Sequence, residues 1–124
     1  DGGEGTYQAV RRSIPFVLHA HGDNREDWDC LLGLAEEQTH PPELVLTHQT
    51  QNPINGMYNP GGFTDGDRAA CFLTALGVRK ENVKLLGTRS DIVGRWSGDT
   101  EKSSKLQKLQ WMKLILEIQG LWDI

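Results

Sequence analysis

Two short polar segments of this chain hold the residue types from which binding and catalytic sites are built. The first reads HAHGDN, from His19 to Asn24, and follows a short apolar run. His19 and His21 project to the same side of an extended chain, as two metal ligands would. No third ligand follows at a suitable spacing in this motif. Three interpretations therefore stay open: a metal site, a Gly22 turn whose N–H groups hold an anionic oxygen, and a hydrogen-bonded turn that begins a helix.

The second segment reads GGFTDGDR and joins two carboxylates to an arginine. Thr64 and Asp67 have the spacing of a capping box, which is a purely structural explanation for these two residues. That explanation leaves Asp65 and the preceding diglycine unaccounted for. Carboxylates beside backbone N–H groups suit Mg²⁺ that is shared with phosphate oxygens, and Arg68 could bind a phosphate with two hydrogen bonds. The segment is not a Walker A loop, because it lacks the Gly-Lys-Ser/Thr ending.

Two further places offer contacts for a heterocyclic ring. Thr47 and Gln49 follow the second apolar run, and their donors and acceptors suit either an amide-bearing ring or water. In the later segment GTRSDIVGRWSGD, Arg95 stands next to Trp96. Such a pair can stack over a ring or simply pack on the surface.

The elements that must position these residues follow from the apolar pattern. Apolar, partly β-branched runs predict strands over residues 14–20, 43–48 and 82–87. Helical spacing predicts helices over about 25–38, 64–76 and 103–122, the first with Asp23 or Asn24 as its N-cap. For the last helix, the predicted core stripe consists of Trp111, Leu114, Ile115, Ile118, Leu121 and Trp122.

The alternation of strands and helices predicts an α/β fold. We expect a three-layer Rossmann-like domain, with a mostly parallel sheet flanked by helices, over residues 1–124 as a single domain. Ligands of such sheets bind beyond the carboxyl ends of the strands. The polar segments that follow the three predicted strands all fall on that edge, which favours a binding site there.

The composition of the chain argues against some classes of partner. The net charge of −4 comes without a basic stripe and argues against nucleic acid as a partner. No run approaches the ~20 apolar residues that span a bilayer, so we expect no membrane partner. Cys30 and Cys71 lack metal-ligand spacing and are expected to be buried free thiols in the cytoplasm. Because the chain begins with Asp1 and not Met, we expect a piece of a longer protein or a processed chain.

The motifs form a recognisable set when taken in order: VLHAHGDN, NPGGFTDGDRA, LG closing a strand, VGRWS and KLQKLQWMKLI. The set resembles the archaeal 6-hydroxymethylpterin diphosphokinase family, whose catalytic domain is similar to thiamin pyrophosphokinase. The resemblance covers essentially the whole chain. It implies Mg²⁺-dependent transfer of diphosphate from ATP to the hydroxymethyl group of 6-hydroxymethyl-7,8-dihydropterin, with AMP as the co-product.

The resemblance also implies roles for individual residues. The family has an acidic D-x-D-G motif upstream of HAHGDN, and Asp1-Gly2 resembles its tail, which raises the question whether this chain alone is active. An acid is also expected soon after Gly87, and here it is displaced to Asp91. The implied Mg²⁺ ligands are Asp1, Asp65 and Asp67. The implied catalytic residues are His19, His21, Asp65 and Arg68. The implied contacts to ATP and the pterin alcohol are Gly22, Asn24, Thr47, Gln49, Gly61, Gly62, Phe63, Thr64 and Arg95.

Other interpretations stay open beside the diphosphokinase. One is a non-catalytic nucleotide-binding module of the same fold, and another is a diphosphokinase that acts on a thiamin precursor. A metal-dependent deacetylase is a third, and it would hold zinc at His19 or His21. The aromatic side chains Trp96 and Trp122, expected at the surface, leave room for a homo-oligomer.

Overall fold

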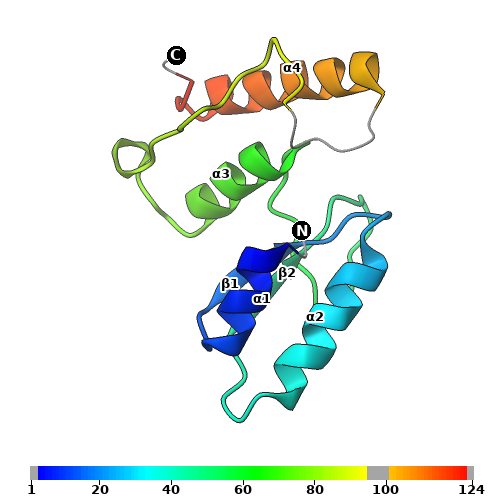
Figure 1. Ribbon diagram of the computed structural model, residues 1–124. Helices are drawn as coiled ribbons and strands as arrows, with labels where there is room; N and C mark the ends of the chain where they lie inside the picture. The colour runs from blue at the N-terminus through cyan, green and yellow to red at the C-terminus, as the bar shows by residue number, and fades with distance from the viewer. Residues whose placement is uncertain (1–2, 95–100, 123–124) are drawn as a thin grey trace. The chain divides into compact units, whose positions relative to one another are not determined.

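The computed structural model describes residues 3–94 and 101–122 and places two parallel strands among its helices (Figure 1). The elements are α1 (Glu4–Arg11), β1 (Phe16–His19), α2 (Arg25–Glu37), β2 (Leu44–Thr47), α3 (Asp65–Ala75), the 3₁₀ helix η1 (Lys80–Asn82) and α4 (Lys102–Ile118). The chain divides into two compact units, unit 1 over residues 1–59 and unit 2 over residues 60–124. Each unit is described by itself.

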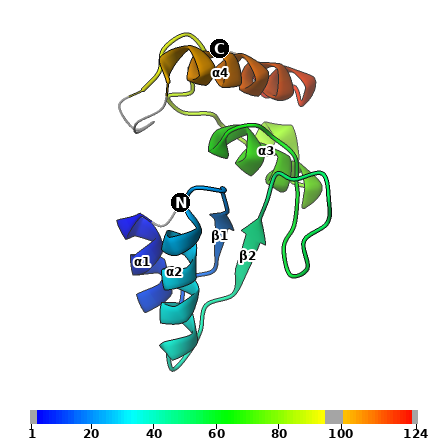
Figure 2. The ribbon, with the colours of Figure 1, turned by 90° about the vertical axis from the view of Figure 1, so that its right-hand side faces the viewer.

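Unit 1 is built on the parallel pairing of β1 with β2. Figure 2 shows α1 and α2 on one face of this sheet. The core between them consists of Val10, Leu18, Leu31 and Ala35, all of them buried. Beyond β2 the chain loops out and returns at Tyr58, whose N–H donates to the Leu46 carbonyl at 2.9 Å. The long loop is therefore fastened at both ends to β2.

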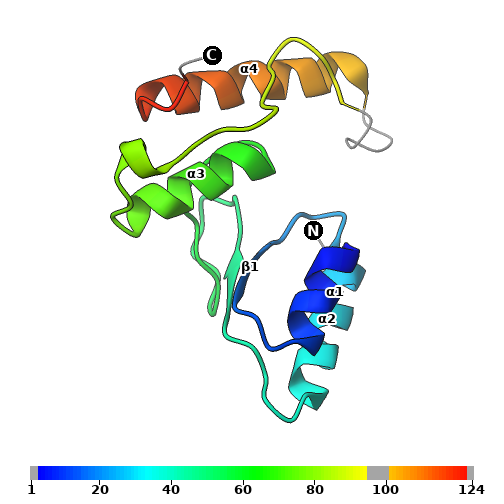
Figure 3. The same ribbon diagram turned by 60° about the vertical axis from the view of Figure 1, so that its left-hand side comes forward.

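Unit 2 is built on the packing of α3 against α4 (Figure 3). The buried cluster consists of Ala70, Leu109, Met112, Leu116 and Leu121, with Val83, Leu85, Leu106 and Trp122 packed against it. α4 ends in a Schellman motif: Gly120 has a φ of 68°, and the Leu121 N–H donates to the Leu116 carbonyl at 2.9 Å. Leu121 is thereby turned back into the core, and the helix ends four residues before the predicted end at Trp122.

Most of the predicted elements are confirmed. β1 and β2 lie within the first two predicted strands, α2 follows Asn24, and α3 follows Thr64. The α/β class is thus confirmed in the form of a small parallel sheet with helices. A three-layer Rossmann-like arrangement is not confirmed, because the described residues form a sheet of two strands. None of the described helices is long and apolar enough to cross a membrane.

The predicted third strand, residues 82–87, is wrong. The segment after η1 is extended at Val83 but pairs with no strand among the described residues. Val83 and Leu85 turn toward α4 and pack on the core of unit 2, while Leu86 stays exposed. The alternation of the side chains is that of a strand, but helix α4 and not a sheet covers the apolar side.

The predicted core stripe of α4 is wrong for half of its six members. Trp111, Leu114 and Ile118 are exposed, and the buried residues are Leu109, Met112 and Leu116 on the opposite side of the helix. α4 carries apolar residues on two faces, and at 3.6 residues per turn both satisfy helical spacing. Leu121 is buried and Trp122 packs against the core, and both reach it through the turn after the helix.

The two thiols differ. Cys71 on α3 is buried as predicted, whereas Cys30 on α2 is exposed, which corrects the expectation that both are buried. The buried residues of α2 are Leu31 and Ala35, and Cys30 is not among them. Burial raises the pKa of the Cys71 thiol, which keeps it protonated and unreactive near neutral pH.

The start of α3 explains the diglycine. Gly61 and Gly62 have φ values of 94° and 95°, a backbone conformation that residues other than glycine rarely adopt. A Cβ on Gly62 would lie 2.6 Å from the backbone nitrogen of Arg68, in the first turn of α3. Thr64 and Asp67 close a capping box across the same turn. The loop can therefore approach the helix this closely only with glycine at position 62.

We predict that Gly62→Ala lowers the free energy of unfolding by about 3 kcal/mol, because it combines a disfavoured φ with a clash against backbone. Gly66→Ala is the matched control within the same motif. Its Cβ would meet only the Thr64 hydroxyl at 4.0 Å, so the better helix propensity of alanine should add about 0.5–1 kcal/mol. Urea unfolding of both variants tests this, and a Gly62→Ala chain as stable as the wild type would contradict the close approach.

We further predict that Leu116→Ala lowers the free energy of unfolding by about 3 kcal/mol, because it opens a cavity in the core of unit 2. Ile118→Ala, on the exposed face of the same helix, should change it by less than about 0.5 kcal/mol. Thermal and urea unfolding would measure both. The reverse order would show that the face predicted from the sequence is the buried one after all.

Candidate functional site

The HAHGDN segment of unit 1 is a turn closed by the side chain of Asn24. The Asn24 Oδ1 accepts from the His21 N–H at 2.5 Å, and its Nδ2 donates to the His19 carbonyl at 3.0 Å. Asn24 is buried and stands at the N-cap of α2, yet its side chain bonds to the turn and not to the helix. Asn24 thus fixes the backbone between the two histidines. Gly22 lies exposed at the tip of this turn, with no atom within 4 Å of an added Cβ.

The carboxyl ends of β1 and β2 bring two predicted site residues together. His19 pairs with Thr47 in the parallel register, and the His19 Nδ1 lies 2.7 Å from the Thr47 hydroxyl. The Ala20 N–H donates to the Thr47 carbonyl at 2.9 Å, which continues the pairing one residue further. Thr47 is fully buried and His19 partly so. The hydroxyl of Thr47 therefore orients the imidazole of His19, and this makes Thr47 a positioning residue in this geometry.

A third histidine stands at the same edge and was missed in the sequence. His48 follows Thr47 and is buried, and its Nδ1 accepts from the Thr50 N–H at 3.2 Å and lies 3.0 Å from the Thr50 hydroxyl. Its position directly after the second apolar run, where a strand ends, is the feature of the sequence that points to His48. Its ring shapes the loop after β2, whereas Gln49 next to it is exposed.

In unit 2, Asp67 is held in place by the residues that precede α3. Its Oδ2 accepts from the Phe63 N–H, and its Oδ1 accepts from both the N–H and the hydroxyl of Thr64, all at 2.6 Å. The side chain is fully buried. Asp67 therefore caps the N-terminus of α3: its carboxylate lies in the first turn and accepts three short hydrogen bonds. Asp67 and Thr64 are thus committed to the start of α3.

Asp65 and Arg68 are the other two charged residues of this turn. Arg68 is fully buried. Burial lowers the pKa of its guanidinium, while the carboxylates of Asp65 and Asp67 raise it. An arginine remains charged in such a setting, so Arg68 balances the two carboxylates. The turn therefore combines two negative charges and one positive charge around the N-terminus of α3.

Phe63 projects from the same loop toward solvent. Its ring is about half exposed and stacks on Trp111 of α4, with 5.7 Å between the ring centroids. Such an exposed aromatic ring can take part in binding, but the stack on α4 already gives it a structural role.

Asp91, the acid expected after Gly87, is also engaged by a neighbour. The Arg89 Nη2 donates to Asp91 at 2.7 Å, and this hydrogen bond lowers the pKa of Asp91.

The predicted site residues thus fall into two groups, each assembled within its own unit. Unit 1 holds His19, His21, Gly22, Asn24, Thr47 and Gln49, and unit 2 holds Gly61, Gly62, Phe63, Thr64, Asp65, Asp67 and Arg68. Asp1, Arg95 and Trp96 lie outside the described residues. Within the part of the chain that the structure describes, no three histidine, cysteine or acidic side chains are grouped closely enough to hold a metal ion. The Mg²⁺ ligand set therefore stays a prediction.

Two curated proteins match most of the chain. A Pyrococcus furiosus protein named 6-hydroxymethyl-7,8-dihydropterin pyrophosphokinase is 36% identical over 116 residues, which cover 89% of this chain and 46% of the relative. A Methanothermobacter thermautotrophicus protein of the same name is 34% identical over 95 residues, which cover 76% of this chain and 37% of the relative. No family model matches the chain. No solved structure matches it significantly.

The chain therefore spans less than half the length of either relative. The Pyrococcus match is long enough that it necessarily includes both polar segments, HAHGDN and GGFTDGDR. The resemblance inferred from the motifs is thereby confirmed: over most of its residues, this chain is similar to archaeal proteins named 6-hydroxymethyl-7,8-dihydropterin pyrophosphokinase.

Proposed function

We propose that this chain is part of an enzyme that transfers diphosphate from ATP to the hydroxymethyl oxygen of 6-hydroxymethyl-7,8-dihydropterin, with AMP as the co-product. The observation that carries the proposal is the match to relatives of that name across both polar segments. The site geometry supports it, because the turn before α3 is built to hold carboxylates and an arginine at a helix N-terminus. Phosphate-transferring enzymes rely on such charges more than on covalent chemistry.

In the proposed reaction the alcohol oxygen attacks the β-phosphorus of ATP. A bond forms between that oxygen and the β-phosphorus, and the bond from the β-phosphorus to the oxygen that bridges to the α-phosphate breaks. The alcohol gives up its proton, and AMP leaves with the bridging oxygen. The main requirements are alignment of the two reactants and neutralisation of the charge on the phosphate oxygens.

The chain's residues would divide this work. His19, held by Thr47, and His21, held in the turn closed by Asn24, would orient the alcohol or bind phosphate oxygens. Backbone N–H groups at Gly22, and at the glycine loop before α3, would bind further oxygens. Arg68 is fully buried, so its positive charge would steady the transferred or leaving phosphate from beneath the surface of the turn. Gln49 and Arg95 would meet the heterocyclic rings, whereas the fully buried Thr47 would act through His19.

Mg²⁺ is compatible with the oxygen donors present. Mg²⁺ prefers one or two carboxylates and takes its other ligands from phosphates and water. Asp67 accepts three hydrogen bonds from the start of α3, so its position beside Asp65 is fixed. Asp65 would hold the ion, with Asp67 beside it and Asp1 as a further ligand. When bound, the ion would neutralise negative charge that builds up between the phosphates.

The reaction class can be tested by its products. We predict that the full-length protein that contains this chain, given ATP, Mg²⁺ and 6-hydroxymethyl-7,8-dihydropterin, forms AMP and the pterin diphosphate in equal amounts, as measured by chromatography. A thiamin precursor in place of the pterin tests the alternative acceptor. Formation of ADP would contradict diphosphate transfer. Nucleotide binding without turnover would favour the non-catalytic module, and stoichiometric zinc in the purified protein would favour the deacetylase.

The role of Asp65 can be separated from its effect on the helix. We predict that Asp65→Asn lowers kcat by a factor of about 100 or more, because it weakens charge neutralisation at the phosphates. Asp27→Asn is the matched control: Asp27 also lies in the first turn of a helix, α2, and is exposed. It reproduces the loss of a favourable helix-dipole interaction. Equal turnover of the two variants would contradict the assignment of Asp65.

A further inference from the structure

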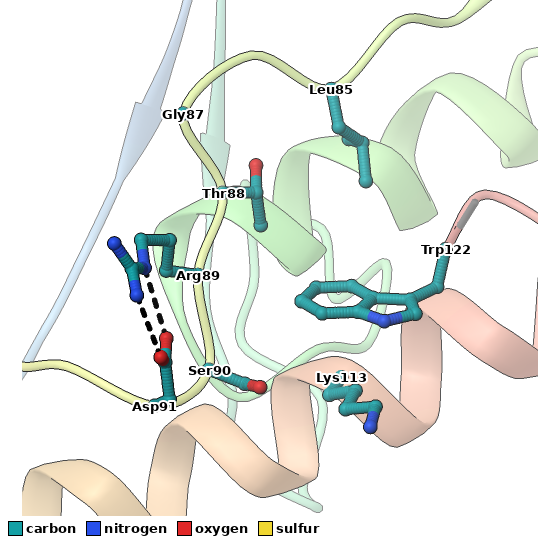
Figure 4. A pocket seen from close by; sticks show the side chains of 8 residues that line it. All are labelled: Leu85, Gly87, Thr88, Arg89, Ser90, Asp91, Lys113 and Trp122. Atoms are coloured by element: carbon teal, nitrogen blue, oxygen red, sulfur yellow. Dashed lines mark hydrogen bonds and ion pairs between the residues drawn. The ribbon is translucent and has the colours of Figure 1, made fainter. Parts of the chain in front are cut away.

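Unit 2 contains an open pocket that the proposed reaction does not use. Its volume is about 610 Å³, and it lies between α4 and the segment that follows the extended chain at 83–86. It is lined by Leu85, Gly87, Thr88, Arg89, Ser90, Asp91, Lys113 and Trp122 (Figure 4). Small-molecule sites span about 300–1,000 Å³, so the pocket has the size for an organic molecule and is larger than a single ion needs.

The walls of this pocket are fixed by contacts that the structure records. The Gln110 side chain on α4 donates to the Ser90 carbonyl at 2.8 Å and ties the 87–91 loop to the helix. Gly87, with a φ of 67°, turns the chain into that loop. On the other side, the Schellman motif at Gly120 buries Leu121 and leaves Trp122 half-buried at the pocket wall. Figure 4 shows the Trp122 ring facing Thr88 across the pocket.

The charges of the pocket favour an anion. Arg89 and Asp91 form a bidentate pair, at 3.0 and 2.7 Å, and neutralise each other. Of the lining residues, Lys113 then supplies the net charge. Its ammonium lies 5.8 Å from the centroid of the Trp122 ring. Its ion pair with Glu117 is long, at 3.7 Å, and partly exposed, and such pairs contribute little and exchange readily.

We propose that this pocket binds a planar heterocycle that carries a phosphate group. The ring would stack on Trp122, as bases stack on aromatic side chains, and the phosphate would meet the Lys113 ammonium and the hydroxyls of Thr88 and Ser90. Both nucleotides and a pterin diphosphate have this chemistry. Because Asp91 is engaged by Arg89, no carboxylate of the pocket needs a metal ion, and binding there should not require Mg²⁺.

Binding measured in EDTA separates this pocket from the Mg²⁺-dependent reaction, so that failure of one does not imply failure of the other. We predict that the chain binds AMP or 6-hydroxymethyl-7,8-dihydropterin diphosphate in EDTA by calorimetry, and that AMP binds at least tenfold more tightly than adenosine if the nucleotide is the ligand. Whichever of the two compounds, AMP or the pterin diphosphate, binds more tightly is the ligand of the pocket. Failure of both to bind in EDTA would overturn the proposal.

Matched variants locate the ligand. Trp122→Leu should weaken binding about tenfold or more, and Lys113→Gln about fivefold. Trp111→Leu and Lys108→Gln, on α4 but outside the pocket, should change it by less than twofold. Lys113 is on the helix surface, so its variant tests the pocket even if Trp122→Leu unfolds, which circular dichroism would reveal. Weakening by the Trp111 or Lys108 variants alone would place the ligand elsewhere and overturn the proposal.

Discussion

The carboxylate of Asp67 is the interaction on which the arrangement of unit 2 depends. It draws the N–H groups of Phe63 and Thr64 to within 2.6 Å and so fixes where α3 begins. With the helix start fixed, Gly62 lies against the first turn of α3, and that turn carries Asp65 and Arg68. The GGFTDGDR motif, which suggested phosphate chemistry, therefore serves first to begin a helix. The same hydrogen bonds that begin the helix also set the positions of Asp65 and Arg68.

Unit 1 reaches a comparable result through strand pairing. Parallel register sets His19 beside Thr47, and the next residues along each chain form turns: the one after His19 is closed by Asn24, and the one after Thr47 by His48 and Thr50. Side chains that look like ligands in the sequence thus serve partly to shape backbone. The same residue types favour function and local structure because a buried carboxamide, hydroxyl or imidazole must find hydrogen-bond partners wherever it stands.

The two mistaken predictions in unit 2 have a shared cause. Periodicity identifies which residues of an element can face a core, but it does not say what that core is made of. The segment after η1 alternates like a strand, yet it packs Val83 and Leu85 on a helix. α4 has two apolar faces, and the one predicted from the sequence is exposed at Trp111, Leu114 and Ile118. In both cases the missing information is the identity of the partner surface, which is a property of contacts distant in sequence.

The sequence by itself determined the local features of this protein: the starts of α2 and α3, the first two strands, the capping box and the motifs that carry the family resemblance. These depend on residues within a few positions of one another, where propensity, capping and turn geometry act. Tertiary structure alone decided which face of α4 is buried, that Gly62 must lie against α3, and that Lys113 and Trp122 share a pocket with the 87–91 loop. Those outcomes depend on packing between elements, and many distant pairings satisfy the same local pattern.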